Sequence, residues 1–174
     1  MSNLETVHVD AASASESTLL SNLLELYMHD LSALFPAIAL GPDGRFGYPS
    51  LHLYWSEPAR RYPFVIRCGE QIAGFVLVTR GSPASSDPQV FDVAEFFVLR
   101  RFRRSGVGRS TAEQLWRTFP GTWVVRVLLA NAGALAFWST SIAEFAGDAV
   151  REIPHPREPH KWRVFTFESH GAKR

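Results

Sequence analysis

The chain has 174 residues, of which 46% are hydrophobic and 20% are charged, with 18 basic and 17 acidic side chains. This balance is typical of a globular protein with a sizeable core, and long disordered segments are not expected. Because the formal net charge is only +1, no overall field would attract nucleic acid or an anionic membrane, and we expect neither as a partner. No window approaches the roughly 18 uninterrupted apolar residues that a membrane-spanning helix needs.

Cysteine use and the first residues of the chain bear on its location. Cys68 is the only cysteine, so neither an internal disulfide nor a cysteine metal cluster can form within one chain. Residues 1–8 lack the basic segment and apolar stretch of a secretory signal. Both features favour a reducing, cytoplasmic location, and we expect no metal site.

The N-terminal part is predicted to form a short strand at residues 8–10, followed by a helix. Ser15 or Ser17 is the candidate N-cap of this helix, and apolar residues recur at helical spacing over 19–27. Residues 41–62 are rich in glycine, proline and aromatic side chains, which predicts a long loop region.

The central part reads as three strands and a helix. Two apolar runs, 64–67 and 72–78, flank a turn at 68–71, the pattern of a β-hairpin. A third strand is expected at 90–99, and a helix follows at 107–117 after a glycine-bearing turn.

The C-terminal part adds three strands and one helix. A β-branched and aromatic run predicts a strand at 123–129, and a helix is expected at 132–145. Two final strands are predicted at 149–153 and 162–168, with the loop 154–160 between them. With no internal repeat and no second boundary, we expect one α/β (α+β) domain over the whole chain, 1–174, in which helices flank a single mixed sheet.

The glycine-bearing turn is the most informative local motif. Residues 103–108 read Arg-Arg-Ser-Gly-Val-Gly between a predicted strand and a predicted helix. Gly106 and Gly108 would let a phosphate approach the backbone and can adopt a positive φ, and a helix N-terminus presents bare N–H groups to an anion. A Walker loop needs Gly-Lys-Ser/Thr here, and a Rossmann loop needs a third glycine and an acid on the next strand, so neither fits.

Basic side chains gather around this turn. Cations are unfavourable at a helix N-terminus unless an anion offsets them, so the cluster favours an anionic ligand. Its members are Arg100, Arg101, Arg103, Arg104 and Arg109.

The spacing Arg-x-x-Gly-x-Gly resembles the acetyl-CoA pyrophosphate loop of the GNAT N-acetyltransferase superfamily. Residues 92–99 resemble its central strand, and 131–138 resemble its Asn-x-x-Ala-x-x-Phe-Tyr segment. The similarity covers 64–167, with the specific motifs in 90–140. It implies a GNAT-like acyl-CoA N-acyltransferase fold with a mostly antiparallel sheet. It also implies direct transfer of an acetyl group from acetyl-CoA to a primary amine in a ternary complex.

The resemblance also implies a set of cofactor contacts. The backbone of 98–101 would bulge at the strand end and hold the thioester carbonyl and pantetheine amides, and an ordinary ladder there is the alternative. Backbone N–H groups of 104–109 would bind the pyrophosphate. Asn131 would contact the pantetheine arm, act as a helix N-cap, or both. The residues expected to bind the cofactor are Val98, Leu99, Arg101, Arg103, Arg104, Ser105, Gly106, Val107, Gly108, Arg109, Asn131, Phe137 and Trp138.

Glu95 is the candidate catalytic residue, because it is an acid within an apolar strand. Apolar neighbours would raise its pKa and suit it to act as the general base that takes a proton from the amine. The alternative is a carboxylate on the solvated side of the strand, or one paired with an arginine.

Trp138 departs from the superfamily pattern, in which tyrosine is common at the matching position and can protonate the leaving thiolate. An indole N–H cannot do so near neutral pH. We therefore expect Trp138 to pack against the cofactor arm and the thiolate to take its proton elsewhere or from water.

The acceptor side is less clearly marked. In the superfamily the N-terminal helix and the following loop cover it, so His29, Asp30, Tyr48, Tyr54 and Trp55 are candidates for the acceptor pocket. The aromatic content of residues 46–55 favours a small-molecule amine, whose identity the sequence leaves open.

Two further interpretations remain. His155 and His160 lie in a proline-rich loop without metal-ligand spacing, so we expect them to be exposed. The alternative function is a non-catalytic CoA-binding or regulatory module, which would have no need of Glu95. The oligomeric state is open, with a homodimer among the options.

Overall fold

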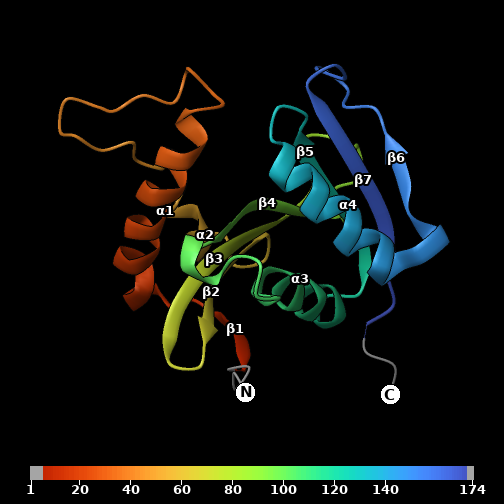
Figure 1. Cartoon of the computed structure of the whole chain (residues 1–174), viewed down its shortest axis with the longest axis horizontal. Helices are drawn as coiled ribbons and strands as arrows, with labels where there is room; N and C mark the ends of the chain where they lie inside the picture. The colour runs from red at the N-terminus through yellow and green to blue at the C-terminus, as the bar shows by residue number, and fades with distance from the viewer. Residues whose placement is uncertain (1–5, 172–174) are drawn as a thin grey trace.

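The computed structural model describes residues 6–171, so residues 1–5 of the segment expected to lack a secretory signal lie outside it. Within the described range the chain builds a seven-stranded sheet in the order β1-β2-β3-β4-β5-β7-β6 (Figure 1). Neighbouring strands are antiparallel except β4 and β5, which are parallel. The predicted mixed, mostly antiparallel sheet is therefore confirmed. The strands are β1 (Val7–Ala11), β2 (Arg61–Cys68), β3 (Gln71–Arg80), β4 (Phe91–Val98), β5 (Gly121–Leu128), β6 (Arg151–Ile153) and β7 (Trp162–Ser169).

Helices cover both faces of the sheet (Figure 1). They are α1 (Ser17–Ser32), α2 (Leu53–Ser56), α3 (Val107–Thr118) and α4 (Ala132–Ala146). The predicted helices and strands are all found, with ends that differ by a few residues. The region 41–62, expected to be a loop, also holds α2 and the start of β2. Among residues 6–171 no helix is long and apolar enough to cross a membrane.

The two faces of the sheet have separate apolar cores. On one face α1 buries leucines against the first four strands, in a cluster that includes Leu20, Leu23, Leu24, Val65, Phe75, Leu77 and Phe97. On the other face α3 and α4 pack over the full width of the sheet, with Val107, Leu115, Trp116, Trp138 and Ile142 among their buried residues.

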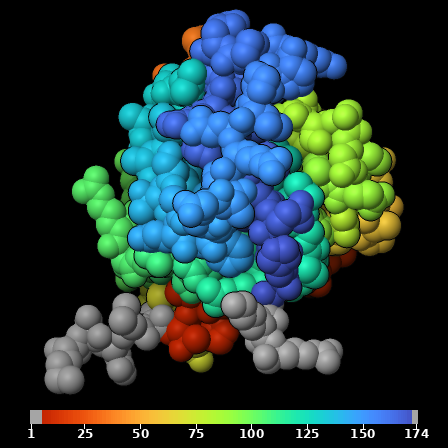
Figure 2. All heavy atoms as spheres, turned by 90° about the vertical axis from the view of Figure 1, so that its right-hand side faces the viewer, coloured from red at the N-terminus to blue at the C-terminus, as the bar shows by residue number. Residues whose placement is uncertain are grey.

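The loop between β3 and β4 forms a third, smaller cluster. Its Ala84 and Val90 pack against Val124 of β5 and Val164 of β7. Figure 2 shows this yellow-green region beside the blue C-terminal segment. The loop therefore covers part of β5 and β7, whereas α1 covers the first four strands.

The parallel pair β4 and β5 is joined over a very short length. Two residue pairs connect them, Phe91 with Trp123 and Asp92 with Val124, although each strand has eight residues. Beyond these pairs β4 stays with β3 and β5 stays with β7. The two strands consequently separate toward their C-terminal ends, which leaves an opening in the sheet where open α/β sheets place ligands.

The bulge in β4 does not lie at 98–101, and that expectation is wrong. The register between β3 and β4 shifts near Ala94, which has no residue opposite it. The ladder instead continues past the strand end, where the Leu99 N–H donates to the Ala73 carbonyl at 2.8 Å. A single 3₁₀ turn, Arg100–Phe102, then follows.

The bulge at Ala94 reverses which side chains of β4 face which core. Before it, Phe91 and Val93 belong to the core under α3 and α4; after it, Phe96 and Val98 do. Without an extra residue, positions 93 and 95 would share a face, because side chains alternate along a strand. The bulge therefore turns Glu95 toward the face covered by α1.

Two local expectations need correction. Neither Ser15 nor Ser17 is the helix N-cap: the N-cap of α1 is Glu16. Ser13 caps the 3₁₀ turn Ala14–Glu16 before it, and its N–H donates to the Glu16 carboxylate at 3.0 Å in a capping box. The 3₁₀ turn that this box opens leads directly into α1, and so moves the start of the helical region toward the N-terminus.

His155 is buried, not exposed, with 7% of its surface accessible. Its ring stacks on Trp162 at 5.8 Å between centroids, and its Nδ1 lies 3.1 Å from the Glu158 N–H, which donates to it. A ring contact and a backbone acceptor role explain its burial. His160 is exposed, as expected.

Gly74 of β3 supports a stability prediction, because a Cβ at this position would lie 2.0 Å from the Phe97 carbonyl oxygen of β4. We expect Gly74→Ala to lower the free energy of unfolding by about 1–3 kcal/mol, since the strands must move apart. Urea unfolding measures this. The control is Gly133→Ala, which meets no atom closer than 3.9 Å and should leave stability equal or slightly raised. A Gly74→Ala protein as stable as the parent would contradict the close approach.

Candidate active site

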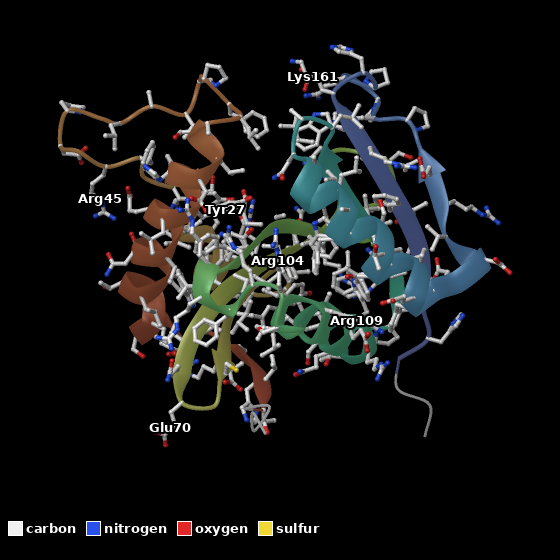
Figure 3. All side chains as sticks on the ribbon, in the orientation of Figure 1. Tyr27, Arg45, Glu70, Arg104, Arg109 and Lys161 are labelled. Atoms are coloured by element: carbon white, nitrogen blue, oxygen red, sulfur yellow. The ribbon has the colours of Figure 1, made fainter. Side chains whose placement is uncertain are left out.

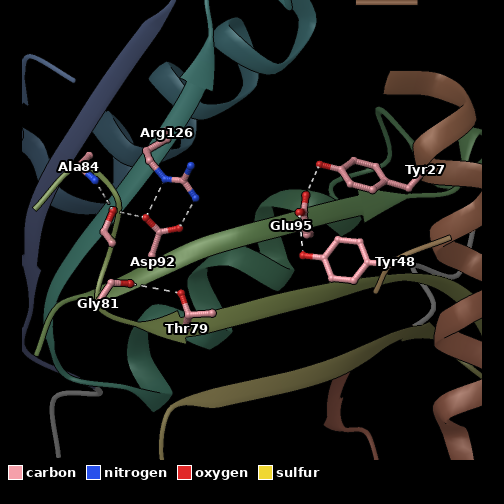
Figure 4. A network of polar contacts seen from close by, with 9 residues as sticks. Tyr27, Tyr48, Thr79, Gly81, Ala84, Asp92, Glu95 and Arg126 are labelled. Carbon is pink, nitrogen blue, oxygen red and sulfur yellow. Dashed lines mark hydrogen bonds and ion pairs between the residues drawn. The ribbon is translucent and has the colours of Figure 1, made fainter. Parts of the chain in front are cut away.

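Glu95 projects from β4 into a cavity of about 840 Å³ on the α1 face of the sheet. Its carboxylate accepts hydrogen bonds from the hydroxyls of Tyr27 at 2.7 Å and Tyr48 at 3.0 Å. Tyr27 belongs to α1 and Tyr48 to the loop before α2, and both rings point toward Glu95 in Figure 4. Three segments far apart in the sequence therefore meet at one carboxylate.

Burial has the largest effect on the pKa of Glu95. It raises the pKa of Glu95 above the ordinary value of 4.5, although the two tyrosine hydrogen bonds and the charge of Arg126 act in the opposite direction. Burial and the nearby Glu95 charge also raise the pKa of Tyr27 and of Tyr48, so both phenols stay protonated as donors. Glu95 is thus a proton acceptor held in a fixed orientation, which suits a general base.

A buried ion pair lies at the point where β4 and β5 separate. Asp92 is completely buried and accepts two hydrogen bonds from Arg126 of β5, at 2.9 and 2.8 Å. The Ser82 hydroxyl also donates to Asp92. Arg126 and Glu95 both line the cavity, and Figure 4 shows Arg126 over Asp92 with Glu95 farther along β4. The pair keeps a positive charge near Glu95 and satisfies the buried carboxylate.

The acceptor-side candidates divide into two groups. Tyr48 and Tyr54 line the cavity, whereas His29, Asp30 and Trp55 do not, so those three expectations are wrong. Trp55 instead packs in the α1 core and donates its indole N–H to the Ala12 carbonyl at 3.0 Å. The His29 side chain is 73% exposed.

The glycine-bearing turn has the backbone of an anion site. Arg104 has φ 60° and Gly106 has φ 86°, both in the left-handed region, and α3 begins directly after them. The first helical bond joins the Ser110 N–H to the Gly106 carbonyl at 2.9 Å. The N–H groups of 106–109 therefore have no acceptor within the helix and are available to a ligand.

The two glycines of this turn are needed for different reasons. A Cβ at Gly106 would meet no atom of the described residues within 4 Å, so this position faces open space where a ligand can approach. A Cβ at Gly108 would lie 3.2 Å from the Phe137 ring. Gly108 consequently allows α3 and α4 to pack closely. The sequence had instead predicted that this glycine lets a phosphate approach the backbone.

Two arginines of the basic cluster are engaged by α1. Asp30 accepts from Arg100 at 2.7 Å and from Arg103 at 3.0 Å. Arg103 also donates its Nε–H to the Val98 carbonyl at 2.7 Å. Although partial burial raises the pKa of Asp30, the hydrogen bonds from Arg103 and Arg100 lower it overall. These contacts join α1 to the start of the glycine-bearing turn.

A third arginine of the cluster is also paired with carboxylates. Fewer arginines are therefore left to attract an anion than the sequence predicted. Arg109 contacts Glu113 at 3.0 Å and Glu144 at 2.5 Å. Among residues 6–171, Arg101 and Arg104 of the cluster form no ion pair. Figure 3 shows Arg104 at the turn and Arg109 on α3. The backbone of the turn carries the anion prediction more strongly than these side chains.

The end of β4 offers one backbone donor to the opening. Because the Leu99 N–H bonds to Ala73 of β3, the alternation of strand backbone groups turns the Val98 N–H toward β5. The Leu99 N–H is engaged and cannot contact a cofactor, which corrects its assignment as a donor. Val98 remains the donor at this edge.

The start of α4 carries the last predicted residues. Asn131 caps α4, accepting the Ala134 N–H at 3.0 Å, and it also lines the cavity. The cap is confirmed, and contact with the pantetheine arm stays a prediction. Trp138 is 6% exposed and packs against Phe96 and Trp116 in the core. Phe137 is half-buried, so more of its surface is exposed than that of Trp138.

Sequence reasoning missed Tyr27 and Arg126 as site residues. Arg126 is a charged residue within the apolar strand β5, the same signal that singled out Glu95. Tyr27 lies on the apolar face of α1, where a hydroxyl directed at Glu95 leaves no trace in the periodicity.

Comparisons with known proteins identify the family and the fold of the chain. The profile of the acetyltransferase (GNAT) family matches residues 21–140. No curated protein sequence compared with the chain matches it.

Solved structures share the fold. An acetyltransferase from Thermus thermophilus is 13% identical, with a TM-score of 0.66 over 95% of this chain and 98% of that one. Spermidine N-acetyltransferase from Vibrio cholerae, in complex with CoA and spermine, is 12% identical, with a TM-score of 0.64 over 94% and 95%. The ribosomal-protein-S18-alanine N-acetyltransferase of Escherichia coli is 14% identical, with a TM-score of 0.59 over 97% of each chain. Since the family profile covers more than half of its residues, the chain belongs to the GNAT family of acetyltransferases.

Proposed function

We propose that the protein transfers the acetyl group of acetyl-CoA directly to the primary amine of a small-molecule acceptor in a ternary complex. The observation that carries this proposal is the Glu95 carboxylate, held by two tyrosines in a cavity beside the opening between β4 and β5. Structural neighbours are named as acting on spermidine and on a ribosomal protein, which supports an amine acceptor. The near-neutral charge and single cysteine support a small acceptor and a cytoplasmic location.

The residues around the opening fit acetyl-CoA. The free N–H groups of 106–109 at a helix N-terminus suit a pyrophosphate, because they present several donors to one anion. The Val98 N–H faces the opening, as an amide of the pantetheine arm or the thioester carbonyl would require. Asn131, the N-cap of α4, lines the cavity, and Phe137 of α4 lies beside Gly108 of the turn. When bound, acetyl-CoA supplies an activated thioester at this place.

Glu95 supplies the proton chemistry in this proposal. It accepts a proton from the amine as the new C–N bond forms and the C–S bond breaks. Tyr27 and Tyr48 hold the carboxylate, and their raised pKa values make them poor acids for the thiolate. The buried indole of Trp138 cannot protonate it either. Glu95 then releases its proton to water, and the leaving thiolate takes a proton from water or from another group of the cavity.

A non-catalytic CoA-binding module is the competing function. Such a module needs the glycine-bearing turn but not a buried carboxylate with two dedicated hydroxyl donors. Keeping this group buried raises its pKa and is unfavourable for the charged form. The arrangement around Glu95 therefore favours catalysis.

Gly106→Val tests the cofactor site. Valine is strained at φ 86° and would fill the open space above the turn, so we expect CoA binding to be lost while the protein stays folded. Calorimetry measures the affinity. The control Gly44→Val places the same residue at a φ of 75° with nothing within 4 Å, in a loop away from the turn, and should bind CoA normally. Unchanged CoA affinity in a folded Gly106→Val protein would reject the site.

Glu95→Gln tests the base. We expect kcat to fall about 10²- to 10⁴-fold near neutral pH, with CoA affinity retained, because the amide cannot accept the proton. The loss should shrink at high pH, where the amine deprotonates unaided. Thiol release with a panel of amines measures the rates. Glu70→Gln, at the tip of the β2–β3 hairpin (Figure 3), is the matched control. A Glu95→Gln enzyme with parental rates would reassign Glu95 to a structural role.

Tyr48→Phe tests how the carboxylate is tuned. Glu95 must be unprotonated to act, so kcat/KM should fall as the pH drops through its raised pKa. Removing a hydrogen bond that lowers this pKa should move the acid limb of the profile to higher pH. Tyr62→Phe, whose hydroxyl contacts the Ala59 carbonyl elsewhere, should keep the parental profile. An unmoved acid limb in Tyr48→Phe would show that the hydrogen bond does not set the pKa.

A further inference from the structure

A third tyrosine lines the cavity and donates no hydrogen bond to Glu95, which accepts from Tyr27 and Tyr48. Tyr54 of α2 is only 2% exposed, and its hydroxyl has no hydrogen-bond partner among the described residues. Arg61 lies beside it, with its guanidinium carbon 5.6 Å from the ring centroid. A buried hydroxyl without a partner is unfavourable, so this one is suited to a ligand group.

Once its internal pairs are counted, the cavity wall carries equal numbers of positive and negative groups, and the positive groups are in excess only when the base Glu95 is set aside. Arg126 is matched by Asp92, and Arg61 by Glu57 at 2.7 Å. The remaining charged groups of the wall are Arg60, Arg80, Asp87 and the base Glu95.

Of the two remaining arginines, Arg60 is the better placed to bind a ligand. Arg80 stacks on Phe91 at 3.8 Å and donates to the Gln89 carbonyl at 2.6 Å. Arg60 is exposed, lies next to Arg61 in the chain, and forms no ion pair among residues 6–171. Arg60, Arg61 and Tyr54 together present positive charge and an unused hydroxyl on one side of the cavity.

We propose that the acceptor is a short primary amine whose other end carries a carboxylate, bound by Arg60, Arg61 and the Tyr54 hydroxyl. This inference rests on the proposed function. Burial raises the pKa of Tyr54 to about 12, so its hydroxyl remains a donor. Charge-assisted hydrogen bonds from guanidinium and hydroxyl groups to a carboxylate are among the stronger polar contacts. A polyamine would instead place a second cation against these arginines.

The strand register bounds the length of the acceptor. Glu95 lies opposite Leu77 of β3, and Arg61 of β2 lies opposite Thr79. Two residues along a strand and two strand spacings put the Cα atoms of Glu95 and Arg61 about 12 Å apart. Side chains from both ends shorten that gap, so a few methylene groups between amine and carboxylate suffice.

Matched acceptors test the charge preference. Acetylation rates are compared for ω-amino acids of increasing length, for alkylamines and diamines of the same length, and for aminoalkyl phosphates. We expect kcat/KM for the best ω-amino acid to exceed that of the matched alkylamine at least tenfold, and that of the diamine by more. Equal or better use of alkylamines or diamines would overturn the proposal but keep the acetyltransferase activity. A preference for phosphates would overturn the carboxylate assignment.

Variants locate the effect. Tyr54→Phe and Arg60→Gln should each raise KM for the ω-amino acid about tenfold while leaving KM for the alkylamine unchanged. Tyr54→Phe should unfold in urea no earlier than the parent, because no hydrogen bond within the protein is lost. Arg151→Gln removes an exposed arginine of β6 outside the cavity and should leave both KM values unchanged. An equal change for both amines would indicate a general structural effect and overturn the assignment.

A binding measurement keeps this inference separate from the proposed function. Calorimetry of N-acetyl ω-amino acids against the CoA-loaded protein needs no turnover. Binding that weakens in Tyr54→Phe supports the carboxylate site, and absence of binding overturns it. Failure to bind CoA at all would instead overturn the proposed function and, with it, this inference.

Discussion

One extra residue in the central strand determines that the Glu95 carboxylate faces the cavity. Side chains of a strand alternate between its faces, so the bulge at Ala94 moves the following residues to the opposite faces. It places Glu95 among the tyrosines on the α1 side and returns Phe96 and Val98 to the core under α3 and α4. In an unbulged strand the carboxylate would lie in that apolar core, where no hydroxyl could reach it.

The early end of the β4–β5 ladder depends on the same region of the strand. Asp92 is the last residue of β4 that pairs with β5, and its carboxylate is held by Arg126 from across the gap. A buried carboxylate is tolerated because it is fully hydrogen-bonded. The ion pair thus connects the strands at the point where their backbones part. Cavity and opening are therefore formed by neighbouring residues of one strand.

Much of the fold and part of the site could be predicted from the sequence. Apolar periodicity and turn residues predicted the helices and strands, and Gly106 with its neighbours predicted the turn whose backbone forms the candidate anion site. Glu95 was identifiable because a charge in an apolar strand is rare. The position of the bulge was not, since register is a property of two strands and not of one run of residues. Tyr27 and Tyr48 lie 68 and 47 residues from Glu95, so only the tertiary fold brings them together.

The contacts of Asp30 have a mechanical consequence. Asp30 sits near the end of α1, the helix that forms one wall of the cavity, and it holds Arg100 and Arg103 at the turn leading into α3. Through Arg103 the connection reaches the Val98 carbonyl at the tip of the central strand. Besides its leucine packing and the Tyr27–Glu95 hydrogen bond, α1 is thereby joined by charge to the glycine-bearing turn. While these ion pairs hold, a shift of α1 is transmitted to the tip of β4, so the cavity wall and the strand end move as one body.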